Sequence, residues 1–131
     1  MRKLFSIVLF ALPNLTFGQN QERLSVHFYD IPYELEEMYL KFNSDINEEL
    51  EKNGFGKDFY KIYKVKDDDD AKKFRYFQIS TYTSDKHYQM THEVGEKYDE
   101  IWDNMWNSEL GKCFPLDDIK HIYRKVYRIE N

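Results

Sequence analysis

The stretch LSVHFYDIPYELEEMYLKFNSDINEELEKNG, residues 24–54, contains a change in hydrophobic period at Pro32. Before the proline, apolar residues alternate with others, and this period of two predicts a strand over 24–31. After it, acids occupy the first turns and apolar residues recur at three- and four-residue spacing, as in an amphipathic helix. Asn53-Gly54 is a common helix stop. The apolar stripe of this helix consists of Leu35, Met38, Tyr39, Phe42, Ile46 and Leu50.

The remaining chain alternates between the same two periods. A second helix is predicted from a cap at Thr83 or Ser84, with an apolar face that runs from His87 to Met105. The order strand, helix, strand, strand, helix, strand predicts an α+β fold of ferredoxin-like βαββαβ topology. In that fold one four-stranded antiparallel sheet carries both helices on one face. The three further strands are predicted over 59–65, 74–82 and 119–129.

The amino terminus has the tripartite pattern of a secretory signal peptide. Arg2-Lys3 precedes a short apolar run, and small residues precede a cut before Gln19. The apolar run is far shorter than the ~20 residues that cross a bilayer. We therefore expect residues 1–18 to be removed and residues 19–131 to form one domain. The expected location is periplasmic or secreted, with no membrane association after cleavage.

The charge balance limits the possible partners. The net charge of the whole chain is −5. Loss of Arg2 and Lys3 with the signal peptide would take it to −7. Nucleic acids require a basic footprint, so we expect no nucleic-acid partner.

The sequence predicts no metal site. His87 and His92 are five residues apart, so they do not share a helix face as metal-binding pairs do. His27 and His121 are expected on adjacent strands, but no third ligand with metal spacing accompanies them. The lone cysteine, Cys113, cannot form an intrachain disulfide. The sequence leaves the identity of any cofactor open.

Alternation along the strands divides their residues between two faces of the sheet. We expect the first, the aliphatic face, to lie under the helices and the second, the Tyr/His face, to lie away from them. The aliphatic face comprises Leu24, Val26, Phe28, Phe77, Ile79, Thr81, Ile122 and Val126. The Tyr/His face comprises Ser25, His27, Tyr29, Phe74, Tyr76, Gln78, Ser80, Tyr82, His121, Tyr123, Lys125 and Tyr127.

Five tyrosines are too many for an uncovered sheet face. Each tyrosine buries ~150–250 Å², so five offer on the order of 1,000 Å². The largest apolar patch of a typical monomer is ~300–600 Å². We therefore expect a second copy to cover the Tyr/His face, sheet against sheet, in a two-fold homodimer.

The stretch from Tyr82 to His92 resembles the strand-to-helix passage of the dimeric α/β-barrel superfamily, which includes antibiotic-biosynthesis monooxygenase-like proteins. In that family an aromatic residue ends the third strand, a serine follows two residues later, and a histidine lies about nine residues along. Here Ser84 follows Tyr82, and His92 lies one residue beyond the family position. One residue turns a helix by ~100°, so no role is carried onto His92. The resemblance implies a dimeric barrel that holds flat aromatic or haem-like ligands, some of which are oxidised without a cofactor.

Three hypotheses for function follow from the resemblance and the Tyr/His face. The first is an exported protein that holds a small aromatic or apolar ligand in a Tyr/His-lined space. The second is a cofactor-independent monooxygenase-like enzyme in which His27 or His121 accepts a proton. The third is a non-enzymatic interaction protein that uses the sheet face. The candidate ligand-binding residues are His27, Tyr29, Tyr76, Gln78, His121 and Tyr123.

Overall fold

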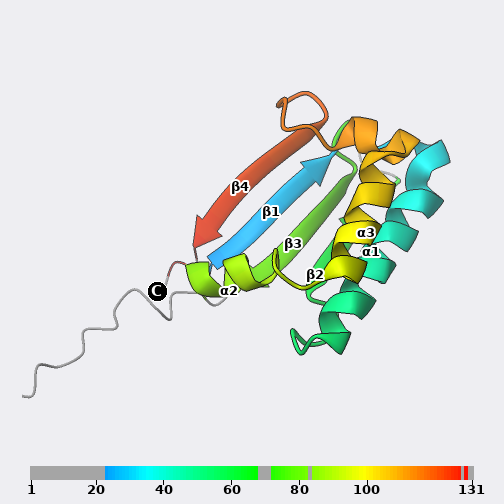
Figure 1. Cartoon of the computed structure of the whole chain (residues 1–131). Coiled ribbons are helices and arrows are strands. Elements are labelled where there is room, and N and C mark those ends of the chain that lie inside the picture. Colours follow the sequence, from blue (N-terminus) through cyan, green and yellow to red (C-terminus); the bar gives the residue numbers. More distant parts are fainter. Residues whose placement is uncertain (1–22, 68–71, 83, 128, 130–131) are drawn as a thin grey trace, which may run out of the picture.

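The computed structural model describes residues 23–67, 72–82, 84–127 and 129 (Figure 1). Its four strands form one sheet in the order β2-β3-β1-β4, with antiparallel neighbours throughout. The predicted α+β ferredoxin-like topology is therefore confirmed. The predicted signal peptide, residues 1–18, lies outside the described residues. In chain order the elements are β1 (Arg23–Tyr29), the 3-10 helix η1 (Tyr33–Leu35), α1 (Glu36–Lys52), β2 (Tyr60–Lys64), β3 (Tyr76–Tyr82), α2 (Asp85–Met90), α3 (Glu96–Trp106), the 3-10 helix η2 (Glu109–Cys113) and β4 (His121–Tyr127).

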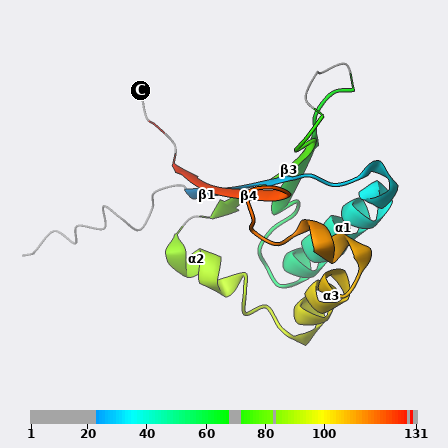
Figure 2. The same ribbon diagram turned by 90° about the horizontal axis from the view of Figure 1, so that it is seen from above.

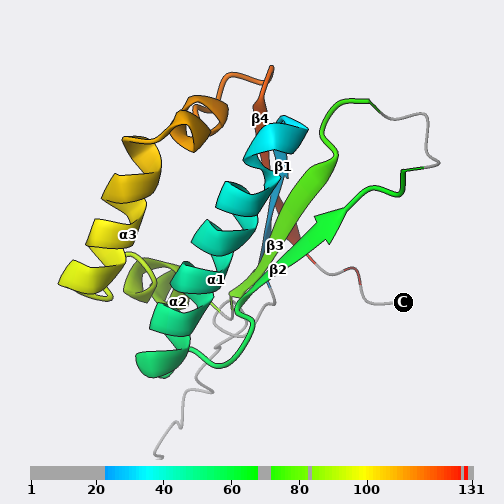
Figure 3. The same cartoon turned by 90° about the vertical axis from the view of Figure 1, so that its right-hand side faces the viewer.

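The helices all lie on one side of the sheet. Figure 2 shows the sheet almost edge-on, with α1, α2 and α3 below it and no helix above it. Helices α1 and α3 run side by side across this layer (Figure 3). No helix in the described part of the chain is both long enough and apolar enough to span a bilayer.

The predicted second helix is divided into two helices. Ser84 caps α2, because its side-chain oxygen accepts a hydrogen bond from the backbone N–H of His87 at 3.1 Å. The chain then leaves helical geometry, and Gly95 precedes α3 with a φ of 141°. Residues with a side chain rarely adopt that conformation, so glycine permits the break. The apolar spacing had suggested one continuous helix because α2 and α3 both turn apolar residues toward the core.

The structure reverses the predicted orientation of the sheet. Tyr29, Tyr76 and Tyr82 of the Tyr/His face are buried under the helices, and Tyr76 retains only 1% exposure. The aliphatic face is the uncovered one, where Val126 is 36% exposed. The prediction that the Tyr/His face lies away from the helices is wrong. The expected dimer contact through that face is therefore wrong as well.

Polar partners on α1 explain why tyrosine and glutamine face inward. The Tyr76 hydroxyl donates a hydrogen bond to the Glu36 carboxylate. The Gln78 side-chain amide donates to Asn43 Oδ1 at 2.7 Å, and Asn43 in turn donates to the Tyr39 carbonyl at 2.8 Å. Burial of a polar group is tolerated when it is hydrogen-bonded, and tyrosine rings bury large apolar areas. The inner face is therefore a packed aromatic core with paired polar ends.

Candidate functional site

A small cavity lies between the inner face of the sheet and the helical layer. Its volume is about 160 Å³. All four strands contribute to its wall, together with α2, α3 and the loops that follow α2 and η2. We call it the sheet–helix cavity. It is lined by His27, Tyr29, Tyr60, Gln78, Tyr82, Tyr88, His92, Trp102, Leu116 and Tyr123.

Four of the six predicted ligand-binding residues line this cavity. They are His27, Tyr29, Gln78 and Tyr123. Period-two alternation placed them together correctly, because residues two apart on a strand share a face. The other two candidates, Tyr76 and His121, are buried on the same face but do not line the cavity.

Sequence reasoning missed six lining residues. Tyr60 and Tyr82 follow the strand alternation that places Gln78 on the inner face, so their position was available from the pattern. Trp102 lies beside the apolar stripe of α3. Tyr88, His92 and Leu116 reach the cavity only because the chain breaks after α2 and folds back after η2. No local sequence signal indicates such long-range placement.

Two histidines on neighbouring strands form a hydrogen-bonded pair at the cavity wall. His27 Nδ1 and His121 Nε2 are 2.7 Å apart. The register explains the contact, because His27 lies opposite Tyr123 and His121 opposite Tyr29, which makes the histidines diagonal neighbours on one face. Aromatic rings hold the pair on both sides. The Tyr123 ring centroid lies 4.7 Å from that of His27, and the Tyr29 ring centroid lies 4.4 Å from that of His121.

The hydrogen bonds of this pair fix which nitrogens carry protons. His121 Nδ1 lies 2.5 Å from the Phe114 carbonyl oxygen. A carbonyl oxygen only accepts, so His121 Nδ1 carries a proton and donates it. Neutral His121 then offers Nε2 as an acceptor, and His27 Nδ1–H must be the donor to it. The remaining nitrogen of a neutral His27, Nε2, carries a lone pair and makes no hydrogen bond with any described residue.

Burial keeps both histidines in the neutral form. Loss of solvation, together with the neighbouring His121, lowers the pKa of His27 from 6.5 to about 3. Burial also lowers the pKa of His121. At neutral pH the pair is therefore an uncharged hydrogen-bonded chain that starts at the Phe114 carbonyl and ends at Nε2 of His27.

Several other hydroxyl groups of the wall are hydrogen-bonded within the protein. The Tyr123 hydroxyl lies 3.1 Å from the Ser25 hydroxyl, and Tyr60 and Tyr82 share a hydrogen bond of 3.4 Å. The indole N–H of Trp102, by contrast, is buried and has no hydrogen-bond partner among the described residues. Burial raises the pKa of the Tyr98 hydroxyl, and the indole N–H of Trp102 beside it acts in the opposite direction.

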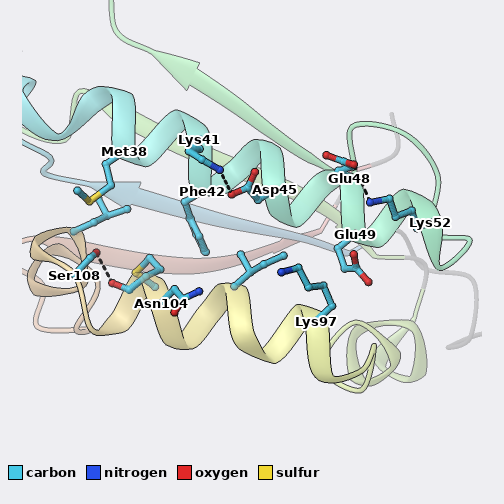
Figure 4. Close-up of a pocket in the computed structure, with 13 residues that line it drawn as sticks. Met38, Lys41, Phe42, Asp45, Glu48, Glu49, Lys52, Lys97, Asn104 and Ser108 are labelled. Carbon is cyan, nitrogen blue, oxygen red and sulfur yellow. Dashed lines mark hydrogen bonds and ion pairs between the residues drawn. The ribbon is translucent and has the colours of Figure 1, made fainter.

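A larger hollow is a groove of about 520 Å³ between α1 and α3. Figure 4 shows its floor, which includes Phe42, and its charged rim. Each lysine of the rim is already paired with an acid three or four residues away. The groove thus has no unpaired lysine to attract an anion; its acid Glu49 accepts a hydrogen bond from the Asn53 side chain, and no histidine lines the groove. The pairs are Lys41–Asp45, Lys52–Glu48 and Lys97–Glu100.

Metal-binding and thiol chemistry receive no support from the described residues. Within them, no group of three or more His, Cys, Asp or Glu side chains is arranged to hold a metal ion. Cys113 is buried in η2, and burial raises the pKa of its thiol. A raised pKa favours the unreactive thiol over the thiolate.

Comparison of the chain with protein-family models and with curated proteins finds no match.

Proposed function

We propose that the protein binds a small aromatic molecule, about one six-membered ring in size, in the sheet–helix cavity. The observation that carries this proposal is the size of the cavity, about 160 Å³, in a wall rich in aromatic rings. An apolar protein cavity of about 150 Å³ accommodates benzene. The rings of Tyr29, Tyr123 and Trp102 provide faces and edges against which another ring packs favourably.

The resemblance to the dimeric α/β-barrel superfamily supports the same class of ligand. The proteins it resembles hold flat aromatic ligands between sheet and helices or inside the barrel. Haem, which the resemblance also implies, does not fit here, because its macrocycle contains four rings and the cavity holds about one. We also propose that the protein is exported to the periplasm or the medium, on the basis of its signal-like amino terminus.

The test is to close the cavity with a bulky side chain. Leu116 lines the cavity and is 65% exposed, so Leu116→Trp extends a large ring over the opening without replacing a core residue. Ile119→Trp is the matched control, since Ile119 lies in the same loop with 64% exposure and does not line the cavity. We expect Leu116→Trp to weaken binding of toluene at least tenfold, as measured by chemical-shift titration, and Ile119→Trp to leave it unchanged. Equal binding by both variants would contradict the proposal.

A second candidate function is cofactor-independent oxidation of the bound ring, in which Nε2 of His27, an unprotonated nitrogen at the cavity wall, is the available proton acceptor. The lowered pKa of His27 makes it a weak base, so this reaction is expected to be slow. In that reaction His27 accepts a proton from a ring carrying a CH₂ group. One atom of O₂ replaces the two hydrogens as a carbonyl oxygen, and the other atom leaves with them as water. The test is oxygen uptake by the purified protein with a neutral one-ring substrate that carries an acidic CH₂ group. Uptake at the same rate in His27→Asn would argue against it.

We further propose that two copies associate through the aliphatic face. Strands rise about 3.3 Å per residue and lie about 4.8 Å apart, so three strands of seven residues and one of five present roughly 400 Å² in projection. Two such faces bury about 800 Å² in projection, and the uneven surface of the side chains adds to this area. The total is near the ~1,000 Å² at which specific association begins. Phe28, Phe77 and Tyr63 form an aromatic row across this face, with ring centroids 5.8 and 5.0 Å apart. The expected dimer is therefore weak.

Introduction of charge into this face tests the dimer. Ile79→Lys places an ammonium group at the middle of the aliphatic face, in the row that already carries Lys61 and Arg124 at its edges. We expect sedimentation equilibrium to give twice the monomer mass for the wild-type protein at high concentration and the monomer mass for the variant. Met90→Lys, at an exposed position of α2, is the control and should still dimerise. A monomeric wild-type protein would refute the proposal.

A further inference from the structure

The chemistry of the cavity wall narrows the class of ligand. We propose that the sheet–helix cavity selects a neutral molecule with a hydroxyl group, phenol being the simplest, and that Nε2 of His27 accepts the hydrogen bond from that hydroxyl. This inference rests on the proposed function, because it assumes that the cavity holds a ring. It adds the polar group by which the ring is recognised.

The hydrogen-bond chain makes Nε2 of His27 an acceptor. The Phe114 carbonyl fixes the proton on Nδ1 of His121, and His121 Nε2 fixes the proton on Nδ1 of His27. Both histidines are thereby held in the Nδ1–H form, which is the less common one for free histidine in water. His27 lines the cavity, and Nε2 is its only ring nitrogen left for a ligand. A buried acceptor gains most from a ligand that brings a donor.

The absence of formal charge in the wall excludes ions. None of the ten lining residues is Asp, Glu, Lys or Arg. The titratable groups around His27 are His121, His92 and tyrosines from β1, β2, β3, β4 and α2. A carboxylate or ammonium ligand would lose its water without gaining a countercharge, which is unfavourable. The low pKa of His27 has the same origin, since this site already disfavours an imidazolium.

The indole N–H of Trp102 points to a hydroxyl group in particular. It is a buried donor in the same wall without a partner among the described residues. The wall therefore offers an acceptor, His27 Nε2, and a donor, the Trp102 indole N–H, which lies near the Tyr98 hydroxyl. A hydroxyl group both donates and accepts, so it is the smallest neutral group that complements either position.

His121 is a positioning residue in this account. It lies behind His27, does not line the cavity, and acts by holding His27 Nδ1–H. Replacement of His121 should leave the space for a ring intact. It should reduce the preference for a hydroxyl group by freeing the His27 proton to move between the two ring nitrogens.

The first experiment compares four one-ring probes by chemical-shift titration of ¹⁵N-labelled protein at pH 7. Phenol and toluene have nearly the same shape and differ in the donor, whereas benzoate and benzylammonium carry opposite charges. One net hydrogen bond is worth about 0.5–1.5 kcal/mol, so phenol should bind about 2- to 13-fold more tightly than toluene. Benzoate and benzylammonium should bind more weakly than toluene. If no probe binds, the proposed function fails. If toluene and phenol bind equally, or either ion binds best, the inference fails and the proposed function stands.

Matched variants test which nitrogen is responsible. His27→Asn keeps an N–H near the Nδ1 position, so it preserves the donor to His121 and removes Nε2. We expect phenol to lose its advantage over toluene in this variant while toluene affinity is retained. His27→Gln places an amide near the Nε2 position and should restore part of the advantage. Loss of toluene binding in both variants would assign His27 a purely structural role and overturn the inference.

The third experiment reads the proton positions directly. In ¹⁵N–¹H correlation spectra of the unliganded protein, Nε2 of His27 and Nε2 of His121 should both be unprotonated. His121→Asn retains a donor to the Phe114 carbonyl but removes the acceptor for His27. The fraction of His27 with an unprotonated Nε2 should fall, together with the phenol-to-toluene ratio. A wild-type spectrum with His27 protonated on Nε2 would refute the assignment, whether or not any ligand binds.

Discussion

Mild acid should destabilise this protein through His27. The pKa of His27 is about 3 in the folded protein, where the side chain is buried, and 6.5 in the unfolded chain, where it is exposed to water. Between these values the unfolded chain binds a proton that the folded chain does not. The contribution to stability is therefore complete above about pH 6.5 and falls as the pH is lowered toward 3. His121 acts in the same direction, because its pKa is also lowered.

The size of the effect follows from the two pKa values. At pH 5 protonation lowers the free energy of the unfolded state by about 2 kcal/mol for His27 alone, because one pKa unit corresponds to about 1.4 kcal/mol. Typical domains have a free energy of unfolding of only about 5–15 kcal/mol, so this loss is a substantial part of the total. With a urea dependence near 2 kcal/mol per molar, the unfolding midpoint should fall by about 1 M.

Urea unfolding at pH 7.5, 6.5, 5.5 and 5.0 measures this slope. The range stops at pH 5 because carboxylates begin to contribute below it. Glu36 is one of these, since Lys64 and Tyr76 hold its pKa below the usual range. His27→Asn should lose most of the slope, and His92→Gln, which removes an exposed histidine outside the pair, should retain it. Equal midpoints at pH 7.5 and 5.0 would refute the reasoning, as would an undiminished slope in His27→Asn.

Two further substitutions test the packing of the core by the same urea assay. Tyr76→Phe removes the hydroxyl that donates to the partly exposed Glu36 carboxylate and should lower the free energy of unfolding by about 1.5 kcal/mol. Tyr63→Phe, on the uncovered face, should change the free energy of unfolding by less than about 0.5 kcal/mol. Equal effects of the two substitutions would contradict the role given to the hydrogen bond between Tyr76 and Glu36. Gly111→Ala would place a methyl carbon 2.8 Å from the Trp106 carbonyl carbon, a backbone atom that cannot rotate away. We therefore expect the free energy of unfolding to fall by about 2–3 kcal/mol. An unchanged urea midpoint would show that the turn after α3 adapts to the methyl group.

Local pattern was sufficient for the order of elements and for the assignment of strand residues to common faces. Each depends on nearest neighbours along the chain. Pro32 separates a period of two from a period of 3.6, and alternation alone places His27 with Tyr29. The contact between His27 and His121 also follows from alternation once the two strands are taken to be adjacent.

The break between α2 and α3 was not evident from the sequence, although one residue indicated it. Gly95 has a φ of 141°, which no other residue type adopts without strain. The apolar spacing continues through it because both helices pack on the same sheet. The prediction followed the apolar spacing and gave one helix, whereas in the folded chain the backbone conformation at Gly95 separates α2 from α3.

Which face of the sheet is covered was decided only by tertiary structure. Both faces of the sheet carry enough apolar surface to be buried, so composition alone does not decide which face the helices cover. The choice depends on whether the helices supply polar partners, and α1 supplies Asn43 to Gln78 and Glu36 to Tyr76. Asn43, a polar residue beside the apolar stripe of that helix, is the one sequence feature that indicated a polar inner face. Sequence periodicity thus determines which side chains lie together, whereas hydrogen bonding between elements distant in the chain determines what they face, because a buried polar group is stable only where a partner meets it.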